Sequence, residues 1–392
     1  MERTQVAIIG AGPAGLTLSH LLARAGISSV VLESRSREYV ERRVRAGVLE
    51  QGTVDLLTET GVGERLKREG LVHHGIELRF DHERHRIPLT ELAGGRSITV
   101  YGQQEVVKDL IQARLDAGGT IHFESGAMSI LDLDTDVPCV RYEQNGETRE
   151  LHADFVAGCD GFHGISRPAI PAGVLTAYDH TYPFAWLGIL AAAAPTVHEV
   201  TYAHHERGFA LYSMRSPEVS RLYLQVRPDE RLEDWPEARI WQELRTRLAT
   251  RDGGTVNEGP ILESGITALR SYVVEPMQYG RLFLAGDAAH IVPATGAKGL
   301  NLAVADVRVL ADGLTEWYGS GRREQLDAYS EVCLRRVWRA QHFSWFMTSM
   351  LHRFEEDGVF QQRLQLSQLR YVVSSRAAAV SLAENYVGLV SV

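Results

Sequence analysis

The chain has 392 residues, of which 44% are hydrophobic and 23% charged, and its formal net charge is −9 at pH 7. This length and composition predict a globular protein with a large core and more than one lobe, and the acidic balance argues against nucleic acid as a partner. The longest apolar run beyond the N-terminal segment, residues 184–194, is shorter than the roughly 20 residues of a membrane helix, so no membrane span is expected.

The first predicted elements are a strand, a helix and a second strand. The apolar run at residues 4–9 is followed by a helical stretch that closes at Gly26, and the next run, residues 28–33, ends in Glu33. Three glycines separate the first strand from the helix: Gly10, Gly12 and Gly15. Such glycines permit a tight turn and bring a pyrophosphate close to the helix N-terminus, while the acid accepts from a ribose hydroxyl. The pattern predicts a dinucleotide site, which explains these glycines better than a signal peptide does.

Two later strands each end in a carboxylate. Residues 151–161 form an apolar strand that ends in Asp160 and Gly161, and residues 281–287 form another that ends in Asp287. Open α/β sheets bind ligands beyond the carboxyl ends of their strands. Both segments are therefore expected beside the dinucleotide.

Between residues 178 and 270 the pattern changes to alternating runs, which predict antiparallel strands of a separate sheet with one buried face. Alternation puts Ser213 and Arg215 on one face of their strand, and Arg221, Tyr223 and Gln225 on one face of the next. A guanidinium flanked by hydroxyls suits a planar carboxylate. The alternative, favoured by the pattern alone, is a polar face that meets solvent.

The chain after residue 306 is predicted to be helical. Its bulky residues are expected to divide between core packing and a subunit interface: Trp338, Phe343, Trp345 and Phe346. The cysteines are far apart and form no CxxC pair, so we expect packing residues in a reduced, cytoplasmic setting: Cys139, Cys159 and Cys333. No ligand spacing indicates a metal site.

Three motifs in order, GAGPAG at 10–15, CDGFHGISR at 159–167 and GDAAHIVPATGAKGLN at 286–301, resemble the single-component flavoprotein aromatic hydroxylases. The likeness includes RAGVLEQG, SMRS, HRF and ENYVGL and covers essentially all of the chain. It implies an α/β (α+β) fold in which a Rossmann-like FAD-binding domain of the glutathione-reductase type carries an inserted antiparallel-sheet substrate domain and a C-terminal helical region. The implied bounds are 1–70, 100–177 and 270–310 for the FAD-binding domain, 71–99 and 178–269 for the substrate domain, and 311–392 for the helical or interface region.

The resemblance also implies an activity. FAD would be reduced by NADPH or NADH, and one oxygen atom of O2 would be inserted at the 3-position of 4-hydroxybenzoate through a flavin C4a-hydroperoxide, giving 3,4-dihydroxybenzoate. A homodimer is implied, without a nucleic-acid or membrane partner. A hydroxylase of another ring acid, such as 3-hydroxybenzoate or 4-aminobenzoate, and a non-catalytic protein of the same fold remain as alternatives.

For the substrate, the resemblance implies that the carboxylate is bound by Ser213, Arg215 and Tyr223. Tyr202 and Tyr386 match the pair that relays the phenol's proton toward His73, whose intrinsic pKa of about 6.5 suits exchange with solvent. Pro293 and Ala294 would also contact the substrate. Ala294 departs from the family pattern, which has a second proline whose carbonyl accepts from the substrate hydroxyl; the carbonyl survives the change, but the rigidity of the loop is in doubt.

For FAD, the resemblance implies that Asp287 contacts the ribityl chain and that residues 293–301 run past the isoalloxazine, with a helix N-terminus facing its pyrimidine end. The full set of implied FAD contacts is Gly10, Gly12, Ala14, Gly15, Glu33, Arg43, Arg45, Gln103, Asp160, His163, Arg221, Asp287, Gly299, Leu300 and Asn301. The nicotinamide nucleotide would be held by Ser34, Arg35, Tyr39, Arg45, His163 and Arg270.

The segment 34–45 is predicted to be a helix that sets the preference between NADPH and NADH. Ser34 stands where the NADPH-dependent pattern has an arginine, and acids at Glu38 and Glu41 interrupt the positive charge. The alternative is a solvated helix face with i,i+4 pairing of Glu38 and Arg42. The donor remains open.

Overall fold

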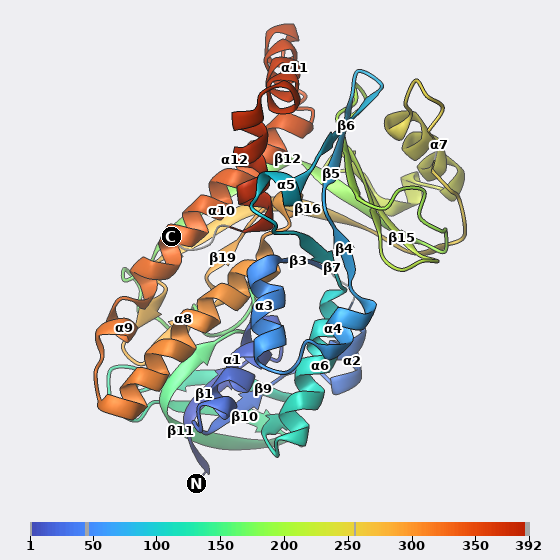
Figure 1. Cartoon of the computed structure of the whole chain (residues 1–392). Coiled ribbons are helices and arrows are strands. Elements are labelled where there is room, and N and C mark those ends of the chain that lie inside the picture. Colours follow the sequence, from blue (N-terminus) through green and yellow to red (C-terminus); the bar gives the residue numbers. More distant parts are fainter. Residues whose placement is uncertain (1, 44–46, 255, 389–392) are drawn as a thin grey trace.

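The computed structural model describes residues 2–43, 47–254 and 256–388. Figure 1 shows two large sheets joined end to end, with the longest helices along one side. The N-terminal unit matches the predicted strand, helix and strand: β1 (Glu2–Ile9), α1 (Pro13–Arg24) and β2 (Ser29–Leu32). β1 pairs in parallel with β2 and β11. Its residues from Val6 to Ile8 are fully buried, because helices and other strands cover both faces of a parallel sheet.

The first sheet has the strand order β17-β18-β11-β1-β2-β8, with β9 and β10 extending from β11. Its further strands are β8 (Thr120–His122), β9 (Ser125–Leu131), β10 (Cys139–Gln144), β11 (Glu147–Gly158), β17 (Gln278–Tyr279) and β18 (Leu282–Leu284). β11 and β18 run parallel to β1, so the segments after Gly158 and Leu284 emerge at the same edge as the glycine-rich turn. The predicted meeting of these three segments is confirmed.

The second sheet has the order β19-β16-β12-β15-β14-β13-β5-β6 and contains the predicted antiparallel strands. Its members are β5 (Ile76–Phe80), β6 (Glu83–Ile87), β12 (Thr176–Ala191), β13 (Val200–Ala203), β14 (Ala210–Met214), β15 (Ser220–Val226), β16 (Ile261–Glu275) and β19 (His290–Ile291). β13 and β5 pair in parallel, which brings residues 76–87 beside the later strands. A third, small sheet joins the two regions: β3 (Val48–Glu50), β7 (Ile98–Val100) and β4 (Leu71–His73).

Helices cover the sheets. The shorter ones are α2 (Arg37–Arg42), α3 (Gln51–Glu59), α4 (Glu64–Glu69), α5 (Leu89–Leu92), α6 (Gln103–Asp116), α7 (Glu237–Leu248) and the 3-10 turns η1 (Leu232–Asp234), η2 (Gly286–Ala288) and η3 (Ala294–Gly296). The C-terminal part is helical, as predicted: α8 (Gly299–Ser320), α9 (Glu324–Asp327), α10 (Tyr329–Leu351), α11 (Val359–Ser374) and α12 (Arg376–Val387). None of the helices in the described ranges has the length and apolarity needed to cross a bilayer.

Two expectations about local structure were wrong. The helix predicted over residues 34–45 is shorter, because α2 begins only after Ser36, whose hydroxyl caps it by accepting from the Tyr39 N–H at 3.2 Å. The alternation between residues 178 and 270 also concealed α7. This helix places Ile240, Trp241 and Leu244 against the second sheet, so both faces of that sheet are buried rather than one.

The packing of α7 makes a stability prediction. Leu244 is fully buried, so Leu244→Ala should lower the free energy of unfolding by roughly 2–5 kcal/mol through the cavity it leaves. Gln242→Ala, on the exposed side of the same helix, should change it by less than about 0.5 kcal/mol. Urea unfolding of the two variants measures the difference. Equal effects would contradict the assignment of α7 as a cover of the sheet.

Candidate functional site

The glycine-rich turn has the shape of a diphosphate cradle. Gly10 has a φ of +102°, and a Cβ there would lie 2.4 Å from the Cys159 carbonyl oxygen; a Cβ on Gly15 would lie 2.0 Å from the Gly10 carbonyl oxygen. Both positions require glycine because the backbone packs too closely for a side chain. Gly12 differs, because no atom lies within 4 Å of its ideal Cβ. It is the N-cap of α1 and has no side-chain cap, so the helix presents backbone N–H groups to open space, as phosphate binding requires.

Glu33 lies at the end of β2, where the dinucleotide pattern places the ribose acceptor. Its Oε2 accepts from the Ala11 N–H at 2.8 Å, and its Oε1 accepts from the Arg35 N–H at 2.8 Å and the Ser34 hydroxyl at 3.3 Å. The carboxylate therefore ties the glycine-rich turn to the start of the segment that leads into α2. A carboxylate has about four acceptor positions, so a ribose hydroxyl can still be bound.

Asp160 shapes the turn after β11. Its Oδ2 accepts from both the N–H and the hydroxyl of Ser166, each at 2.9 Å. A Cβ on Gly164 would lie 2.0 Å from the Asp160 carboxyl carbon, which explains the glycine in this motif. Burial raises the pKa of Asp160. The residue thus acts on the protein's own backbone as well as facing the predicted dinucleotide region.

The turn after β18 is held by the buried ion pair of Asp306 and His290. The Asp306 carboxylate, 1% exposed, accepts from the Gly286 N–H at 3.0 Å and lies 2.6 Å from His290 Nε2. Burial disfavours a charge on His290, but the Asp306 carboxylate outweighs it and raises the pKa of the imidazole. Asp287, next to this anchored glycine, is exposed. The arrangement leaves its side chain accessible to a ligand, as predicted for the ribityl contact.

The first turn of α8 contains the predicted residues Gly299, Leu300 and Asn301, and the helix has no side-chain cap at Lys298. The Asn301 side chain is used internally: Oδ1 accepts from the Glu50 N–H and the Thr53 hydroxyl, both at 2.9 Å. Its Nδ2 donates to the carbonyls of Val48 and Ala297, both at 3.0 Å. Asn301 therefore orients the helix start, and only its backbone is left for a cofactor.

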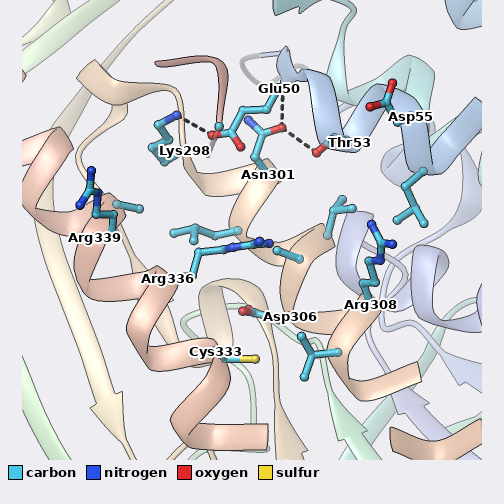
Figure 2. Close-up of a pocket in the computed structure, with 18 of the residues that line it drawn as sticks. Glu50, Thr53, Asp55, Lys298, Asn301, Asp306, Arg308, Cys333, Arg336 and Arg339 are labelled. Atoms are coloured by element: carbon cyan, nitrogen blue, oxygen red, sulfur yellow. Dashed lines mark hydrogen bonds and ion pairs between the residues drawn. The ribbon is translucent and has the colours of Figure 1, made fainter. Parts of the chain in front are cut away.

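Lys298, the N-cap residue of α8, is a buried ammonium with three hydrogen-bond acceptors. Its Nζ donates to Glu50 Oε1 at 2.5 Å and to the carbonyls of Asn385 and Tyr386 at 2.5 and 3.0 Å, although the residue is only 4% exposed. A cavity of 530 Å³ lies between α3, α8 and α10. Figure 2 shows the Lys298–Glu50 pair at one end of this cavity and the Arg336 side chain projecting into it. The predicted carboxylate-binding residues do not line this cavity.

The predicted carboxylate-binding residues lie together on adjacent strands. Ser213 is paired with Arg221 and Leu211 with Tyr223 in the β14–β15 register, so Ser213 and Tyr223 share one face, and Arg215 lies in the bend directly after β14. This face is half-buried rather than open to solvent: Ser213 is 9% exposed, Arg215 and Tyr223 are of intermediate exposure, and Leu211 belongs to a core cluster with residues of α10, α11 and α12. Burial lowers the pKa of Arg215, whose guanidinium donates to Gln104 Oε1 at 3.3 Å.

Arg221 lies beside this group. Its Nε donates to the Tyr223 hydroxyl at 3.2 Å, and its guanidinium lies over the Tyr223 ring at 5.1 Å. Two arginines on one half-buried face make a strongly positive lining, which favours a carboxylate ligand. Arg221 was predicted to contact FAD, and it lies beside Tyr223 and opposite Ser213, two of the predicted carboxylate-binding residues.

Tyr202 and Tyr386 meet as predicted. Their hydroxyl oxygens are 2.5 Å apart although Tyr202 belongs to β13 and Tyr386 to α12, and both residues are at most 2% exposed. Burial raises the pKa of both phenols, so both stay protonated near neutrality. The pair can pass a proton by exchanging donor and acceptor roles, without forming a buried phenolate of its own.

His73 differs from expectation in its environment. It ends β4 and is 1% exposed, whereas its neighbour His74 is exposed. Burial lowers the pKa of His73 to about 4, in place of the intrinsic value expected from the sequence. Among the described residues, neither ring nitrogen has a hydrogen-bond partner. The neutral imidazole therefore has one nitrogen with a lone pair and one N–H without partners, and its lowered pKa makes it a weak base.

The loop before α8 places Pro293 inside and Ala294 outside. Pro293 is buried, and the exposed Ala294 begins η3, where its carbonyl accepts from the Ala297 N–H at 3.0 Å. Ala297 is left-handed, with a φ of +54°. A carbonyl has two lone pairs, so the Ala294 oxygen retains one for a substrate hydroxyl.

The predicted nicotinamide residues divide into two groups. His163 is exposed and packs edge-on against Phe162 with ring centroids 5.0 Å apart, while the Arg270 guanidinium lies 4.4 Å above the same Phe162 ring. Arg270 also pairs with Asp179, Nε to Oδ1 at 2.7 Å. The two residues predicted from distant parts of the sequence therefore border one aromatic ring.

The second group lies around α2. Arg35 lies over the Tyr39 ring at 5.3 Å, Ser34 contacts Glu33, and the expected Glu38–Arg42 pair forms at 2.8 Å. Arg45 lies outside the described residues. Two further predicted FAD contacts are placed at the edges of this region, Arg43 directly after α2 and Gln103 as the first residue of α6.

Three residues of the site were not predicted: Lys298, Glu50 and Gln104. Lys298 was visible within the GAKGLN segment, and a single lysine in an otherwise apolar loop is a signal for a buried pair. Its partner is 248 residues away in sequence, and the Arg215–Gln104 contact spans 111 residues. No local pattern in the sequence announces such pairs.

Comparison with known proteins places this geometry in a family. A family model described as FAD binding domain matches residues 3–344. The p-hydroxybenzoate hydroxylase of Acinetobacter baylyi is 49% identical over 387 residues, which cover 99% of this chain and 96% of that protein. The crystal structure of p-nitrophenol 4-monooxygenase from Pseudomonas putida superposes with a TM-score of 0.85 at 20% identity, covering 99% of this chain and 100% of that one. An aklavinone-11 hydroxylase solved with FAD and aklavinone gives a TM-score of 0.75 at 22% identity, covering 90% and 70%.

The cradle at Gly12 makes a prediction about the cofactor. Gly12→Ala should weaken FAD binding roughly tenfold or more, because the methyl group meets no protein atom but fills the space beside the helix N–H donors. Quenching of flavin fluorescence on titrating the FAD-free protein measures the effect. Gly319→Ala is the matched control, since its Cβ also meets nothing and it lies near the far end of α8. Equal FAD affinity of both variants would contradict the placement of the diphosphate.

Proposed function

The chain belongs to the FAD-binding family of single-component flavoprotein aromatic hydroxylases, and from this membership we propose that it hydroxylates 4-hydroxybenzoate at C3, giving 3,4-dihydroxybenzoate with FAD, O2 and NADH or NADPH. The observation that carries the choice of substrate is the buried hydroxyl pair of Tyr202 and Tyr386, on the same face of the sheet as Ser213 and Tyr223. A ring acid with a phenol at the opposite end from its carboxylate needs both groups. Bound flavin supplies the reductive activation of O2.

The carboxylate of the substrate is proposed to bind Arg215, Ser213 and Tyr223. Arg215 is half-buried in the bend after β14, and burial lowers the pKa of its guanidinium, so an anionic ligand compensates an unfavourable charge. Ser213 Oγ bonds only weakly to the protein, donating to the Met214 carbonyl at 3.2 Å. Both groups gain from a carboxylate that accepts two or more hydrogen bonds.

The phenol is proposed to lie against Tyr202. Oxygen transfer to an aromatic ring is an electrophilic substitution, so removal of the phenol's proton makes the ring more reactive. Tyr202 would take up the phenol's proton and pass one on to Tyr386. His73 is proposed as the next carrier: one ring nitrogen offers a lone pair, and because burial lowers its pKa to about 4 it would pass the proton on rather than hold it. The Ala294 carbonyl supplies a second acceptor for the hydroxyl.

Hydride donation is proposed to use the surface bordered by Phe162. His163 and Arg270 flank this ring, and Arg270 can turn from Asp179 to a phosphate because the ion pair is exposed. Arg35 and Tyr39 would contact the nucleotide's ribose end. Glu38 and Glu41 are engaged by Arg42 and Arg37, so α2 carries little free positive charge, and both NADH and NADPH are proposed as donors.

We also propose a homodimer through the C-terminal helices. α10 and α11 expose large apolar side chains, including Trp345 at 51%, Phe360 at 70% and Val359 at 73%. Phe343, on the same helix as Trp345, is buried, as the expected division between core and interface requires. Exposed groups of this size mark an interaction surface, and a second copy of the chain is the proposed occupant. A cytoplasmic location stays a prediction, in keeping with three buried, unpaired cysteines.

The function is tested by oxygen uptake. The FAD-containing protein should consume O2 with NADH or NADPH only slowly until 4-hydroxybenzoate is added, and should then release 3,4-dihydroxybenzoate in near-stoichiometric amount with little peroxide. Uptake stimulated instead by 3-hydroxybenzoate or 4-aminobenzoate, with the matching product, would favour a hydroxylase of another ring acid. A colourless protein that cannot be reconstituted with FAD would favour a non-catalytic role.

The tyrosine pair makes a separate prediction. Tyr386→Phe removes the proton acceptor for Tyr202, so the rate of product formation should fall by about 100-fold or more, while peroxide per NAD(P)H rises. Tyr212→Phe is the matched control, because Tyr212 is equally buried but belongs to the core on the other face of the same sheet. Product and peroxide are quantified by chromatography and a peroxidase assay. A Tyr386→Phe variant that keeps its product yield would rule out the relay.

A further inference from the structure

The HRF segment, residues 352–354, has no task in the proposed reaction, yet its histidine occupies the centre of an aromatic cluster. His352 is fully buried. Its imidazole is stacked on Phe209 at 4.2 Å and on Phe184 at 4.6 Å, with interplanar angles of 26° and 7°. The plane of Trp186 differs from it by only 10°. The imidazole is therefore enclosed by three aromatic rings.

The hydrogen bonds of His352 fix its chemical form. Its Nε2 lies 2.7 Å from the indole Nε1 of Trp186, and its Nδ1 lies 3.0 Å from the Thr348 carbonyl oxygen. An indole N–H can only donate and a carbonyl can only accept, so Nε2 must carry the lone pair and Nδ1 the hydrogen. Only the neutral Nδ1–H tautomer satisfies both partners. Burial lowers the pKa of His352 to about 3, which keeps this form neutral at working pH.

Trp186, the hydrogen-bond donor to His352, also contacts residues of the proposed substrate pocket. Its ring lies 4.8 Å from Tyr223, the proposed carboxylate ligand, and 5.2 Å from Phe209. Phe209 in turn lies 6.2 Å from Tyr202, the proposed phenol ligand. The indole and Phe209 thus form an aromatic wall that contacts Tyr223 at one end and Tyr202 at the other, the two tyrosines proposed to bind opposite ends of the ring acid.

The backbone around His352 is anchored to the same strand that carries Tyr223. Gln225 Oε1 accepts from the N–H groups of Arg353 and Phe209, both at 3.0 Å, and so locks the segment to the aromatic wall. Gln365 Nε2 donates to the His352 carbonyl at 2.7 Å. On the other side, the Thr348 hydroxyl donates to Thr295 in the loop before α8 at 2.9 Å.

We propose that His352 is a positioning residue for the ring acid: through its hydrogen bond to the Trp186 indole it fixes the aromatic wall against which the side chains of Tyr202 and Tyr223 pack. The proposal rests on the proposed function, because it assumes a ring acid between these tyrosines. His352 touches neither reacting atom. Its loss should therefore weaken binding of the ring acid more than it slows turnover at saturation.

Three variants separate the hydrogen bond from the packing. His352→Leu removes the acceptor, Trp186→Phe removes the donor but keeps an aromatic ring, and His352→Gln restores an acceptor within reach of the indole. The first two should raise the dissociation constant of 4-hydroxybenzoate, measured by perturbation of flavin absorbance, about five- to tenfold. Their turnover at saturating substrate should stay within about threefold, and His352→Gln should restore the dissociation constant to within about twofold.

Trp241→Phe is the matched control. Trp241 is also buried and donates from Nε1 to Glu237 at 3.3 Å, but on α7, so its loss should lower the melting temperature without changing ring-acid binding. If His352→Leu and Trp186→Phe behave like this control, the role of His352 is structural only and the proposal is overturned. It is also overturned if His352→Gln binds the ring acid as weakly as His352→Leu does.

A measurement without substrate keeps this inference separate from the proposed function. Nitrogen-15 NMR of histidine-labelled holoenzyme should show one histidine fixed as the neutral Nδ1–H tautomer from pH 5 to pH 8, and Trp186→Phe should shift its Nε2 resonance. If wild type binds no 4-hydroxybenzoate but this signal is present, the proposed substrate fails while the His352–Trp186 bond stands. An Nε2–H tautomer or an imidazolium at pH 7 would contradict the positioning role directly.

Discussion

The buried ammonium of Lys298 is the constraint on which the two halves of the site depend. A charge this deep is tolerated only with partners, and Lys298 finds them in the Glu50 carboxylate and the carbonyls of Asn385 and Tyr386. Glu50 ends β3 beside the start of α3, and Tyr386 lies on α12. One side chain therefore ties the first turn of α8, where the flavin is proposed to bind, to the helix that carries the proposed relay tyrosine Tyr386. Displacing Glu50 would leave the buried ammonium without its counter-charge, and displacing α12 would remove its two carbonyl partners.

The cost of a buried charge also determines the protonation states of the groups that are proposed to transfer the proton. Burial raises the pKa of both relay tyrosines and lowers the pKa of His73, so all three stay neutral at pH 7 in the free protein. A chain of neutral groups moves a proton without the cost of a standing buried charge. The ring acid would bring the negative charge that pairs with Arg215, at the other end of the proposed pocket. The positive charge of the proposed pocket thus lies at Arg215, and the neutral groups proposed for proton transfer, Tyr202 and Tyr386, lie at the other end.

The sequence predicted the features that depend on local, periodic patterns, and it did not predict contacts between residues that are far apart in the chain. The glycine spacing predicted the βαβ unit, and alternation put Ser213 and Arg215 on one face, because both signals are periodic over a few residues. Alternation could not tell that α7 covers the other face, since its apolar residues lie between strand-like runs. The Lys298–Glu50 pair and the depressed pKa of His73 follow from contacts far apart in the chain, which pattern does not encode. The relay expected of the two tyrosines came from the family resemblance, because periodicity gives no sign of it.

The loop before α8 shows how packing replaces a lost local restraint. Alanine at position 294 removes the stiffness of a proline, and the sequence alone left the rigidity of the loop in doubt. In the fold, the restraint comes from the next residues: Thr295 is fully buried and accepts from the Thr348 hydroxyl at 2.9 Å, and a Cβ on Gly296 would lie 2.5 Å from the Ser344 hydroxyl oxygen. Ala294 itself is exposed. Since α10 holds the loop from inside, the carbonyl proposed to meet the substrate keeps its place without the second proline.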